Sequence, residues 1–486
     1  MKEVKQHSVK YNFLMNFILS ASQFLFPMIT FPYISRVLLA EGNGKVTFAA
    51  SVANYFLMAA SLGIPTYGIR ACAQVRDRRD ELSKTAQEIL LINFITTVLV
   101  TVTYLICIVT VPRFRADKTL FLINGINIVL NMVGMNWLFQ ALEQYDYITF
   151  RSLAFKVISI ILMFAAVHEE TDYVIYGGIT VFAAAGSNLL NLVRTRQYID
   201  FRWMGGYHLK RHMKPILILF AQSLAISIYT NLDTVMLGFL KTDTDVGYYN
   251  AAVKIKSILV SLVTSLGNVL LPRMSYYAKE RKKREFMDTM GMALNFTMLM
   301  SIPLAVYFCM FSTESIRFLA GGGYEGAIRA MEIITVSIVP IGVTGVLGIQ
   351  VLTAIEKEKY VLYSVITGAV VDFILNSLWI PAYGAAGAAF ATVIAEFAVL
   401  VVQLVFTREL VGKIKRNLRG HKYLLLVILA GVAAYGVKRL GIQSNFMVLV
   451  VSAVAFYGIY GVGLVLIKDP FVWNMCRKFM KKNPRL

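Results

Sequence analysis

Long apolar runs with almost no charged side chains are the feature that most constrains the fold of this chain. The runs are about 20 residues long, the length that an α-helix needs to cross roughly 30 Å of membrane hydrocarbon. Charged residues make up only 16% of the chain, whereas soluble domains carry about 25%, so several soluble domains could not be given polar surfaces. The sequence therefore predicts an all-α integral membrane protein and excludes a soluble enzyme.

The apolar runs divide into fourteen predicted transmembrane helices joined by short loops. The longest loop, 194–214, leaves no room for a soluble catalytic or nucleotide-binding domain. We therefore predict that the chain is not an enzyme and that it has no catalytic residues and no cofactor. The predicted spans are 11–34, 46–69, 85–111, 119–141, 150–167, 173–193, 215–240, 247–271, 287–311, 327–354, 360–380, 385–406, 423–440 and 444–467.

Positive charges are distributed unequally between the two ends of the predicted spans. Short cytoplasmic loops retain Lys and Arg, and with a cytoplasmic N-terminus 36 of the 48 such residues lie on that side and 10 on the other. The remaining two, Lys254 and Lys256, lie inside a predicted span. This alternation predicts that both termini are cytoplasmic, and it explains the net charge of +20 without a nucleic-acid partner.

A faint internal repeat relates two parts of the chain at an offset near 204 residues. Ser61-Leu62-Gly63 matches Ser265-Leu266-Gly267, and Gly44 and Gly247 each precede an Ala-Ala pair. Because two six-helix halves are a common transporter architecture, the repeat predicts two pseudo-symmetric six-helix bundles and two extra C-terminal helices with a basic cytoplasmic tail. The expected boundaries of these three parts are 1–200, 201–410 and 411–486.

The first predicted span carries polar side chains three or four residues apart, which places them on one helix face. A lipid-facing amide is costly, so this face either lines a polar cavity or packs against a neighbouring helix. Pro27 and Pro32 follow on the same span and predict a kink. The polar face consists of Asn12, Asn16, Ser20 and Gln23.

Ionisable side chains inside a membrane span are costly, and by default they face a cavity or a charged partner. Lys254 and Lys256 either provide a basic lining for an anionic substrate or extend to the membrane interface. Asp233, in the seventh predicted span, either pairs with one of these lysines or binds a coupling cation or proton. The residues alone leave both alternatives open.

Further polar side chains lie in the eleventh and twelfth predicted spans. Asp372 and Asn376 are one helical turn apart, and Glu396 lies in the middle of the next span. Each is either a functional position or a source of hydrogen bonds that hold helices together. His208 and His212 lack the carboxylate of a zinc-binding HExxH helix, so we expect a basic helix at the membrane surface and no metal site.

Several segments spread over most of the chain resemble a known transporter family. They are similar to the signatures of polysaccharide flippases, the family that moves O-antigen or capsule repeat units. This family belongs to the multidrug/oligosaccharidyl-lipid/polysaccharide exporter superfamily. The matching segments are 31–38 (FPYISRVL), 40–44 (AEGNG), 233–238 (DTVMLG), 247–252 (GYYNAA), 376–381 (NSLWIP) and 383–389 (YGAAGAA).

The resemblance implies a transporter of the bacterial plasma (inner) membrane that works by alternating access. Its substrate would be an undecaprenyl-diphosphate-linked oligosaccharide, carried from the inner to the outer leaflet for surface polysaccharide synthesis. The expected partners are this lipid-linked substrate, the bilayer, H⁺ or Na⁺ as a coupling ion, and the polysaccharide polymerase machinery. A lipid II flippase and a cation-coupled multidrug exporter of the same superfamily are the alternatives.

A diphosphate-sugar head group requires a polar, basic cavity, and this requirement gives the intramembrane residues expected roles. Arg36, Lys254 and Lys256 are the candidates for binding phosphate, although Arg36 could equally be an interfacial anchor. The amides of Asn12, Asn16 and Gln23 are the further candidates for substrate binding. The candidates for ion coupling are Asp233, Asp372 and Glu396.

Overall fold

The computed structural model describes residues 9–265 and 267–473 of the chain. These residues form helices and short connections, and no strand occurs within the two described ranges. They divide into two compact units, Met1–Gly247 (unit 1) and Tyr248–Leu486 (unit 2). The predicted boundaries at 200/201 and 410/411 refer to the halves of the sequence repeat, and they stay predictions.

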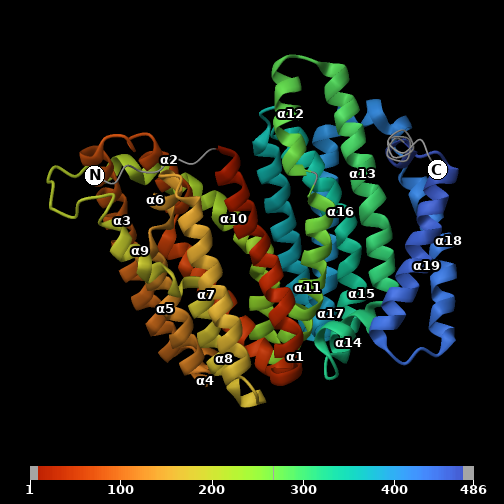
Figure 1. The fold of residues 1–486 in the computed structure, drawn as a ribbon, viewed down its shortest axis with the longest axis horizontal. Helices are drawn as coiled ribbons and strands as arrows, with labels where there is room; N and C mark the ends of the chain where they lie inside the picture. Colours follow the sequence, from red (N-terminus) through yellow and green to blue (C-terminus); the bar gives the residue numbers. More distant parts are fainter. Residues whose placement is uncertain (1–8, 266, 474–486) are drawn as a thin grey trace. The chain divides into compact units, whose positions relative to one another are not determined.

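Unit 1 is built around α1, which contacts α3, α5 and α7 along its length (Figure 1). A π-helical turn at Phe182–Gly186 interrupts the last helical region before the loop that leads to α10. The helices of this unit are α1 (Val9–Ser61), α2 (Ile64–Ala73), α3 (Arg79–Thr110), α4 (Pro112–Ala116), α5 (Lys118–Gly134), α6 (Asn136–Ala141), α7 (Tyr145–Ala166), α8 (Tyr173–Val181), α9 (Asn188–Thr195) and α10 (Lys210–Leu240).

Unit 2 follows along α11 (Asp243–Thr264), which begins in the last residues of unit 1. In this unit α13 packs against α16 and α18, α15 packs against α17, and α18 packs against α19. A second π-helical region, η4, covers Gly345–Leu352. The other helices are α12 (Gly267–Lys279), α13 (Lys283–Met310), α14 (Ser312–Ala320), α15 (Glu325–Ile334), α16 (Ile338–Thr344), α17 (Glu358–Ile414), α18 (Gly420–Val437) and α19 (Asn445–Leu466).

Ten helical segments of the described residues are long and apolar enough to cross a membrane. Two of them, Leu14–Ala73 and Glu358–Asn417, are 60 residues long, and each overlaps two of the predicted spans. The seventh and eighth predicted spans correspond to α10 and α11, which are not among the ten and which carry Asp233, Lys254 and Lys256. The chain is therefore a multi-pass membrane protein, and the number of fourteen spans stays a prediction.

The two longest helices each contain one residue whose backbone is not helical. In α17 this residue is Gly384 (φ 53°, ψ −130°), which tolerates positive φ because it has no Cβ. In α1 it is Leu39 (φ 53°, ψ −169°), a conformation that costs a residue with a side chain on the order of 1–3 kcal/mol. Both Pro27 and Pro32 lie inside α1 before this residue, and the kink predicted at the prolines stays a prediction.

Glycines allow close approach of the backbones just after the break in α1. A Cβ on Gly44 would lie 1.7 Å from the carbonyl oxygen of Asp243. A Cβ on Gly247 would lie 2.0 Å from the carbonyl oxygen of Ala40. The two glycines that the internal repeat matches therefore lie in one tight crossing, where any side chain would separate the backbones.

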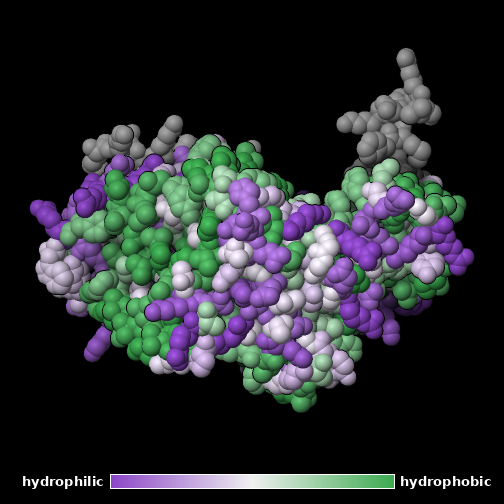
Figure 2. Space-filling model, turned by 90° about the horizontal axis from the view of Figure 1, so that it is seen from below, coloured by the Kyte–Doolittle hydropathy of each residue, from purple (hydrophilic) through white to green (hydrophobic). Residues whose placement is uncertain are grey.

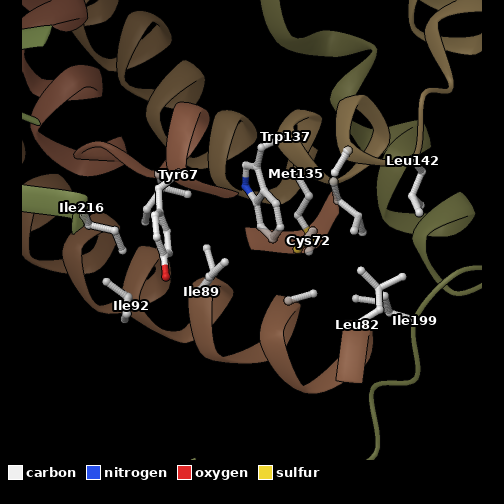
Figure 3. Packing of buried hydrophobic residues seen from close by; sticks show 14 residues of the cluster. Tyr67, Cys72, Leu82, Ile89, Ile92, Met135, Trp137, Leu142, Ile199 and Ile216 are labelled. Atoms are coloured by element: carbon white, nitrogen blue, oxygen red, sulfur yellow. The ribbon is translucent and has the colours of Figure 1, made fainter. Parts of the chain in front are cut away.

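The core of unit 1 contains a cluster contributed by α2, α3 and α6, with Ile216 of α10 at its edge (Figure 3). Trp137 and Tyr67 are its largest members, and Cys72 is fully buried beside them as a free thiol. By contrast, many large apolar side chains of α3, α7, α18 and α19 are exposed, as expected for surfaces that face lipid rather than water. Figure 2 shows extended hydrophobic areas of this kind on the face of the molecule that it presents.

Candidate functional site

The residues predicted to bind substrate or ions differ widely in burial. Asp233, Asp372, Glu396 and Asn12 are at most 7% exposed, although a polar group in an apolar environment must be satisfied to avoid a large cost. Asn16, Gln23 and Arg36 are exposed, and Lys254 and Lys256 are partly buried. The three predicted coupling carboxylates and Asn12 are therefore the deeply buried members of the set.

Asn12 is held by a turn between α6 and α7 rather than by its neighbours on α1. Its Nδ2 donates a hydrogen bond to Glu143 Oε2 at 3.3 Å, and Arg76 Nη1 lies 2.6 Å from the other oxygen of the same carboxylate. The pKa of Arg76 is raised by this contact with Glu143. The predicted polar face is thus divided between Asn12, which is buried in this network, and three exposed side chains, Asn16, Ser20 and Gln23.

Arg36 lies in the last turn of α1 before the break at Leu39. Its guanidinium donates a hydrogen bond to the carbonyl oxygen of Pro32, one turn earlier, and the side chain is exposed. Arg36 and Asp233 belong to unit 1, whereas Lys254 and Lys256 belong to unit 2. The basic cluster and the Asp233–lysine ion pair that the sequence suggested both stay predictions.

The first limb of α17 places two of the predicted residues on its buried face. Buried positions recur every four residues, which is the spacing of one face of an α-helix. Asp372 and Asn376 therefore point to the same side, as their spacing predicted. The buried positions of this limb are Ser364, Gly368, Asp372, Asn376 and Ile380.

The second limb of α17, beyond Gly384, also has a polar buried face. The hydroxyl oxygens of Thr392 and Tyr249 on α11 are 3.0 Å apart, and Glu396 follows Thr392 by one helical turn. Gln403 Nε2 donates a hydrogen bond to Ser364 Oγ at 3.1 Å, which joins the two limbs. The break at Gly384 thus folds α17 back on itself so that polar side chains of both limbs meet inside unit 2.

Unit 1 contains a buried ion pair that the sequence analysis missed. Glu88 on α3 is fully buried and receives hydrogen bonds from the His208 backbone at 2.8 Å and from Arg211 Nη2 at 2.5 Å. Its Oε2 also lies 2.7 Å from His212 Nε2. His212 is 3% exposed, so within this basic segment its side chain is buried in unit 1, whereas Lys210, Arg211 and Lys214 are exposed. Glu88 in an apolar span was the available signal, because such a charge requires a partner.

A second missed network surrounds Arg151 on α7. Its guanidinium donates hydrogen bonds to Asn136 Oδ1 at 2.8 Å, Asn188 Oδ1 at 3.3 Å and the Ser187 carbonyl at 3.0 Å. Arg194 lies 3.9 Å from the ring centroid of Tyr147 nearby. The charge pattern counted Arg151 with the cytoplasmic side, at the start of the predicted span 150–167, whereas α7 begins five residues earlier and contains Arg151 in its second turn. A buried guanidinium bound by amides holds α6, α7 and α9 together.

The loop ends of unit 1 carry exposed ion pairs. Arg79 forms a two-point contact with Asp200 at 2.9 and 3.0 Å, and this hydrogen-bonded pairing lowers the pKa of Asp200. Among the residues that the structure describes, no three His, Cys, Asp or Glu side chains are grouped so that they could hold a metal ion. The absence of a metal or cofactor site stays a prediction.

Two family models match the chain. The model described as "Polysaccharide biosynthesis protein" matches residues 9–278, which is more than half of the chain. The model described as MatE matches residues 219–378. Both models describe transporters of the superfamily whose signatures the sequence motifs resemble.

A curated relative and two solved structures are similar to the chain over most of its length. The chain is 23% identical over 413 residues to the "Putative O-antigen transporter" of Escherichia coli (strain K12), covering 83% of this chain and 97% of that protein. A structure of the lipid II flippase MurJ in an inward closed conformation has a TM-score of 0.73 at 16% identity, covering 94% of this chain and 100% of that chain. An inward-facing multidrug resistance MATE family transporter of the MOP superfamily has a TM-score of 0.59 at 14% identity, covering 80% of this chain and 96% of that chain.

These two structures share the fold with the chain, and the family match supplies the class of activity. A multi-pass helical membrane protein with short loops agrees with both findings. The chain belongs to the polysaccharide flippase family of the multidrug/oligosaccharidyl-lipid/polysaccharide exporter superfamily.

Proposed function

We propose that the chain transfers undecaprenyl-diphosphate-linked oligosaccharide repeat units from the inner to the outer leaflet of a bacterial plasma membrane. The observation that carries this proposal is the family match over residues 9–278 together with a relative, named as an O-antigen transporter, that is covered over 97% of its length. The exported repeat units would serve surface polysaccharide synthesis, in contact with the polymerase that consumes them.

The proposed membrane arrangement has fourteen spans with both termini in the cytoplasm. The distribution of Lys and Arg supports this orientation, because positive loops are retained on the cytoplasmic side. The breaks at Leu39 and Gly384 support the division of α1 and α17 into two spans each, because each break lies between two predicted spans. Alternating access would move two six-helix bundles, at 1–200 and 201–410, with 411–486 as an addition.

The proposed substrate site uses basic and amide side chains. A diphosphate that leaves water must find cations and hydrogen-bond donors to replace its hydration, because a bare charge in a low-dielectric site is costly. Arg36, Lys254 and Lys256 would supply the positive charge. The amides of Asn12, Asn16 and Gln23 would donate to phosphate or sugar oxygens.

The proposed coupling sites are the buried carboxylates Asp233, Asp372 and Glu396. Each is at most 7% exposed in a helical membrane unit, where a charged carboxylate is costly. Binding a proton or Na⁺ neutralises such a group, so its occupancy can be linked to a conformational change. This makes a cation gradient the proposed source of energy for transport.

Two other activities are possible within the same fold. A lipid II flippase would require a similar basic site, and a structure of one shares the fold with this chain. A cation-coupled multidrug exporter would require an acidic cavity for cationic drugs, which does not fit lysines at positions 254 and 256.

Depletion of the protein in its native cell, followed by mass spectrometry of polyprenyl-diphosphate lipids, tests the proposal. We expect one completed lipid-linked repeat unit to accumulate and surface polysaccharide to fall. Accumulation of lipid II instead would assign the protein to the lipid II alternative. An unchanged lipid profile with new sensitivity to cationic drugs would overturn the proposal in favour of drug export.

A further inference from the structure

Two turns with the same backbone geometry occur at corresponding places in the two units. In unit 1, Glu143 has φ 56° and donates its N–H to the Gln140 carbonyl, while the next N–H bonds to Phe139. In unit 2, Glu356 has φ 58° and donates to the Thr353 carbonyl, while the next N–H bonds to Leu352. In both turns a right-handed helical segment ends at a residue with left-handed backbone geometry and is closed by two backbone hydrogen bonds. This residue is a glutamate in both units.

The cations that face these turns also correspond. In unit 1 Arg76 follows Arg70 by six residues, and in unit 2 Lys279 follows Arg273 by six residues, in segments related by the internal repeat. In unit 1 the cation and the glutamate meet, because Arg76 lies 2.6 Å from Glu143 and Asn12 donates to the same carboxylate. The charge at this junction of unit 1 is therefore neutralised within the protein.

In unit 2 the same junction contains a cavity of about 870 Å³ instead of an ion pair. Lys279 at the end of α12 and Glu356 both line the cavity. Neither side chain makes an ion pair or hydrogen bond with any residue that the structure describes. The space that the Arg76–Glu143 contact occupies in unit 1 is thus left available in unit 2.

The lining of this cavity has an excess of positive charge. Its charged residues are four cations and one carboxylate, and the four cations are exposed. None of the four has an acidic partner in the described part of the chain, so they repel one another and attract an anion. The charged lining residues are Lys279, Arg281, Lys283, Lys413 and Glu356.

The lining also includes apolar side chains, namely Phe286, Met287, Ala354, Ile355 and Leu410. A cavity of about 870 Å³ falls in the range of roughly 300–1,000 Å³ of sites for organic ligands, and it is far larger than a free phosphate ion requires. It lies where α12 and α17 end and α13 begins, beside the basic loops that the charge pattern assigns to the cytoplasmic side.

We propose that this cavity of unit 2 binds the phosphate-bearing head group of an anionic phospholipid. The cations contact the phosphate, and the apolar wall contacts the glycerol and the start of the acyl chains. Basic pockets at the cytoplasmic ends of membrane helices suit such head groups, because the anionic leaflet concentrates them there. Occupation by the lipid neutralises in unit 2 the charge that the Arg76–Glu143 pair neutralises in unit 1.

Native mass spectrometry of the full chain, released from neutral detergent, measures this binding. The protein is titrated separately with phosphatidylglycerol, with phosphatidylcholine of the same chains and with inorganic phosphate. We expect retained phosphatidylglycerol, little phosphatidylcholine and no effect of phosphate at equal concentration. Equal retention of the two lipids would overturn the proposal, and competition by phosphate at equal concentration would assign the cavity to a free anion instead.

Paired variants locate the binding. Lys279→Gln with Lys413→Gln should weaken phosphatidylglycerol binding about 30-fold, since each interfacial Lys contributes about 1 kcal/mol. Lys282→Gln with Arg284→Gln removes the same charge from the same region, and it should change affinity less than about twofold because neither residue lines the cavity. Equal losses in the two double variants would show that binding is non-specific, which would overturn the proposal.

Two single variants distinguish the contribution of the cavity's space to binding from the contribution of its charge. Ala278→Trp fills the cavity without changing its charge, and it should abolish binding if the head group enters. Glu356→Gln removes the one carboxylate and should tighten binding of the anionic lipid. Weaker binding by Glu356→Gln, or unchanged binding by a folded, monodisperse Ala278→Trp protein, would contradict the proposal. The assay requires no transport, so its outcome is independent of the proposed flippase activity.

Discussion

Glu88 and His212 are 124 residues apart in the sequence, yet Glu88 Oε2 lies 2.7 Å from His212 Nε2 inside unit 1. His212 also contacts the hydroxyl of Tyr67 through Nδ1 at 2.7 Å, and Arg211 donates to the same carboxylate. These residues come from α2, α3 and α10, so one buried carboxylate connects three helices. The arrangement satisfies a charge that would otherwise be isolated in an apolar core.

Removal of this carboxylate should destabilise unit 1. We expect Glu88→Ala to lower the free energy of unfolding by about 2 kcal/mol, less than for a wholly buried pair because Arg211 is half exposed and can be solvated. Glu81→Ala on the same helix removes an exposed partner of Arg78 and should cost no more than about 0.5 kcal/mol. Thermal unfolding of the purified protein in detergent compares them, and equal melting temperatures would contradict a structural role for Glu88.

The close crossing at Gly44 should not tolerate a side chain. Gly44→Ala would place a Cβ 1.7 Å from the Asp243 carbonyl oxygen, and overpacking of this kind typically costs about 1–3 kcal/mol. Gly291→Ala is the matched control, because a Cβ there meets no atom within 4 Å. In that helix alanine should stabilise by about 0.5–1 kcal/mol, so the two substitutions should shift the melting temperature in opposite directions. A stabilising Gly44→Ala would contradict the crossing.

Loss of a basic side chain from α11 should impair transport without unfolding the protein. We expect Lys256→Gln to reduce export of the surface glycan about tenfold, the effect of roughly 1.4 kcal/mol of lost phosphate binding, at normal protein abundance. Lys415→Gln removes an exposed charge at the end of α17 and should leave export unchanged. Normal export by a well-expressed Lys256→Gln protein would remove this lysine from the mechanism.

Asp233 should be required more for transport than for folding. Asp233→Asn keeps the shape of a buried side chain and removes its charge, so we expect export to fall while the protein still inserts and accumulates. Asp288→Asn, at a site 72% exposed on α13, serves as the control. A misfolded and degraded Asp233→Asn protein would instead support a structural ion pair at this position.

The charge pattern also predicts the side of the membrane on which each end of α19 lies. A reporter that is active only in the cytoplasm should be active when fused after Leu486. The same reporter inserted after Gln443 should be inactive, because this loop is expected on the opposite side. Accessible-cysteine labelling of the same positions provides an independent measurement. A reporter after Leu486 that lies outside the cytoplasm would contradict the fourteen-span arrangement.

Much of the fold follows from local properties of the chain. Apolar runs of membrane-spanning length predicted the helices, and the four-residue spacing of Asp372 and Asn376 predicted their common face, which the structure buries. The motif at 31–38 and the other matching segments predicted the family, and the match of the family model to residues 9–278 confirms it. Hydrophobicity and helical period act over a few residues, so they can be read without knowing what packs where.

Other features depend on segments that are far apart in the chain. The partner of Glu88 is 124 residues away and that of Glu143 is 67 residues away, and no spacing rule identifies either. The charge pattern counted Arg151 with the cytoplasmic side because a charge usually marks the end of a span, whereas three polar groups from other segments hold it inside unit 1. A buried charge is tolerated only when tertiary packing brings its partners together.

The sequence by itself determined the class of protein, the extent of most helices and the family. Tertiary structure alone decided which intramembrane charges are paired, where α1 departs from helical geometry, and that one junction is closed by Arg76 and Glu143 while its counterpart at Lys279 and Glu356 forms a cavity. The physical reason is that the free energy of burying an apolar side chain depends mainly on that side chain itself, so it can be estimated from the sequence. The energy of a charge in a membrane protein, by contrast, depends on every group within a few ångströms of it.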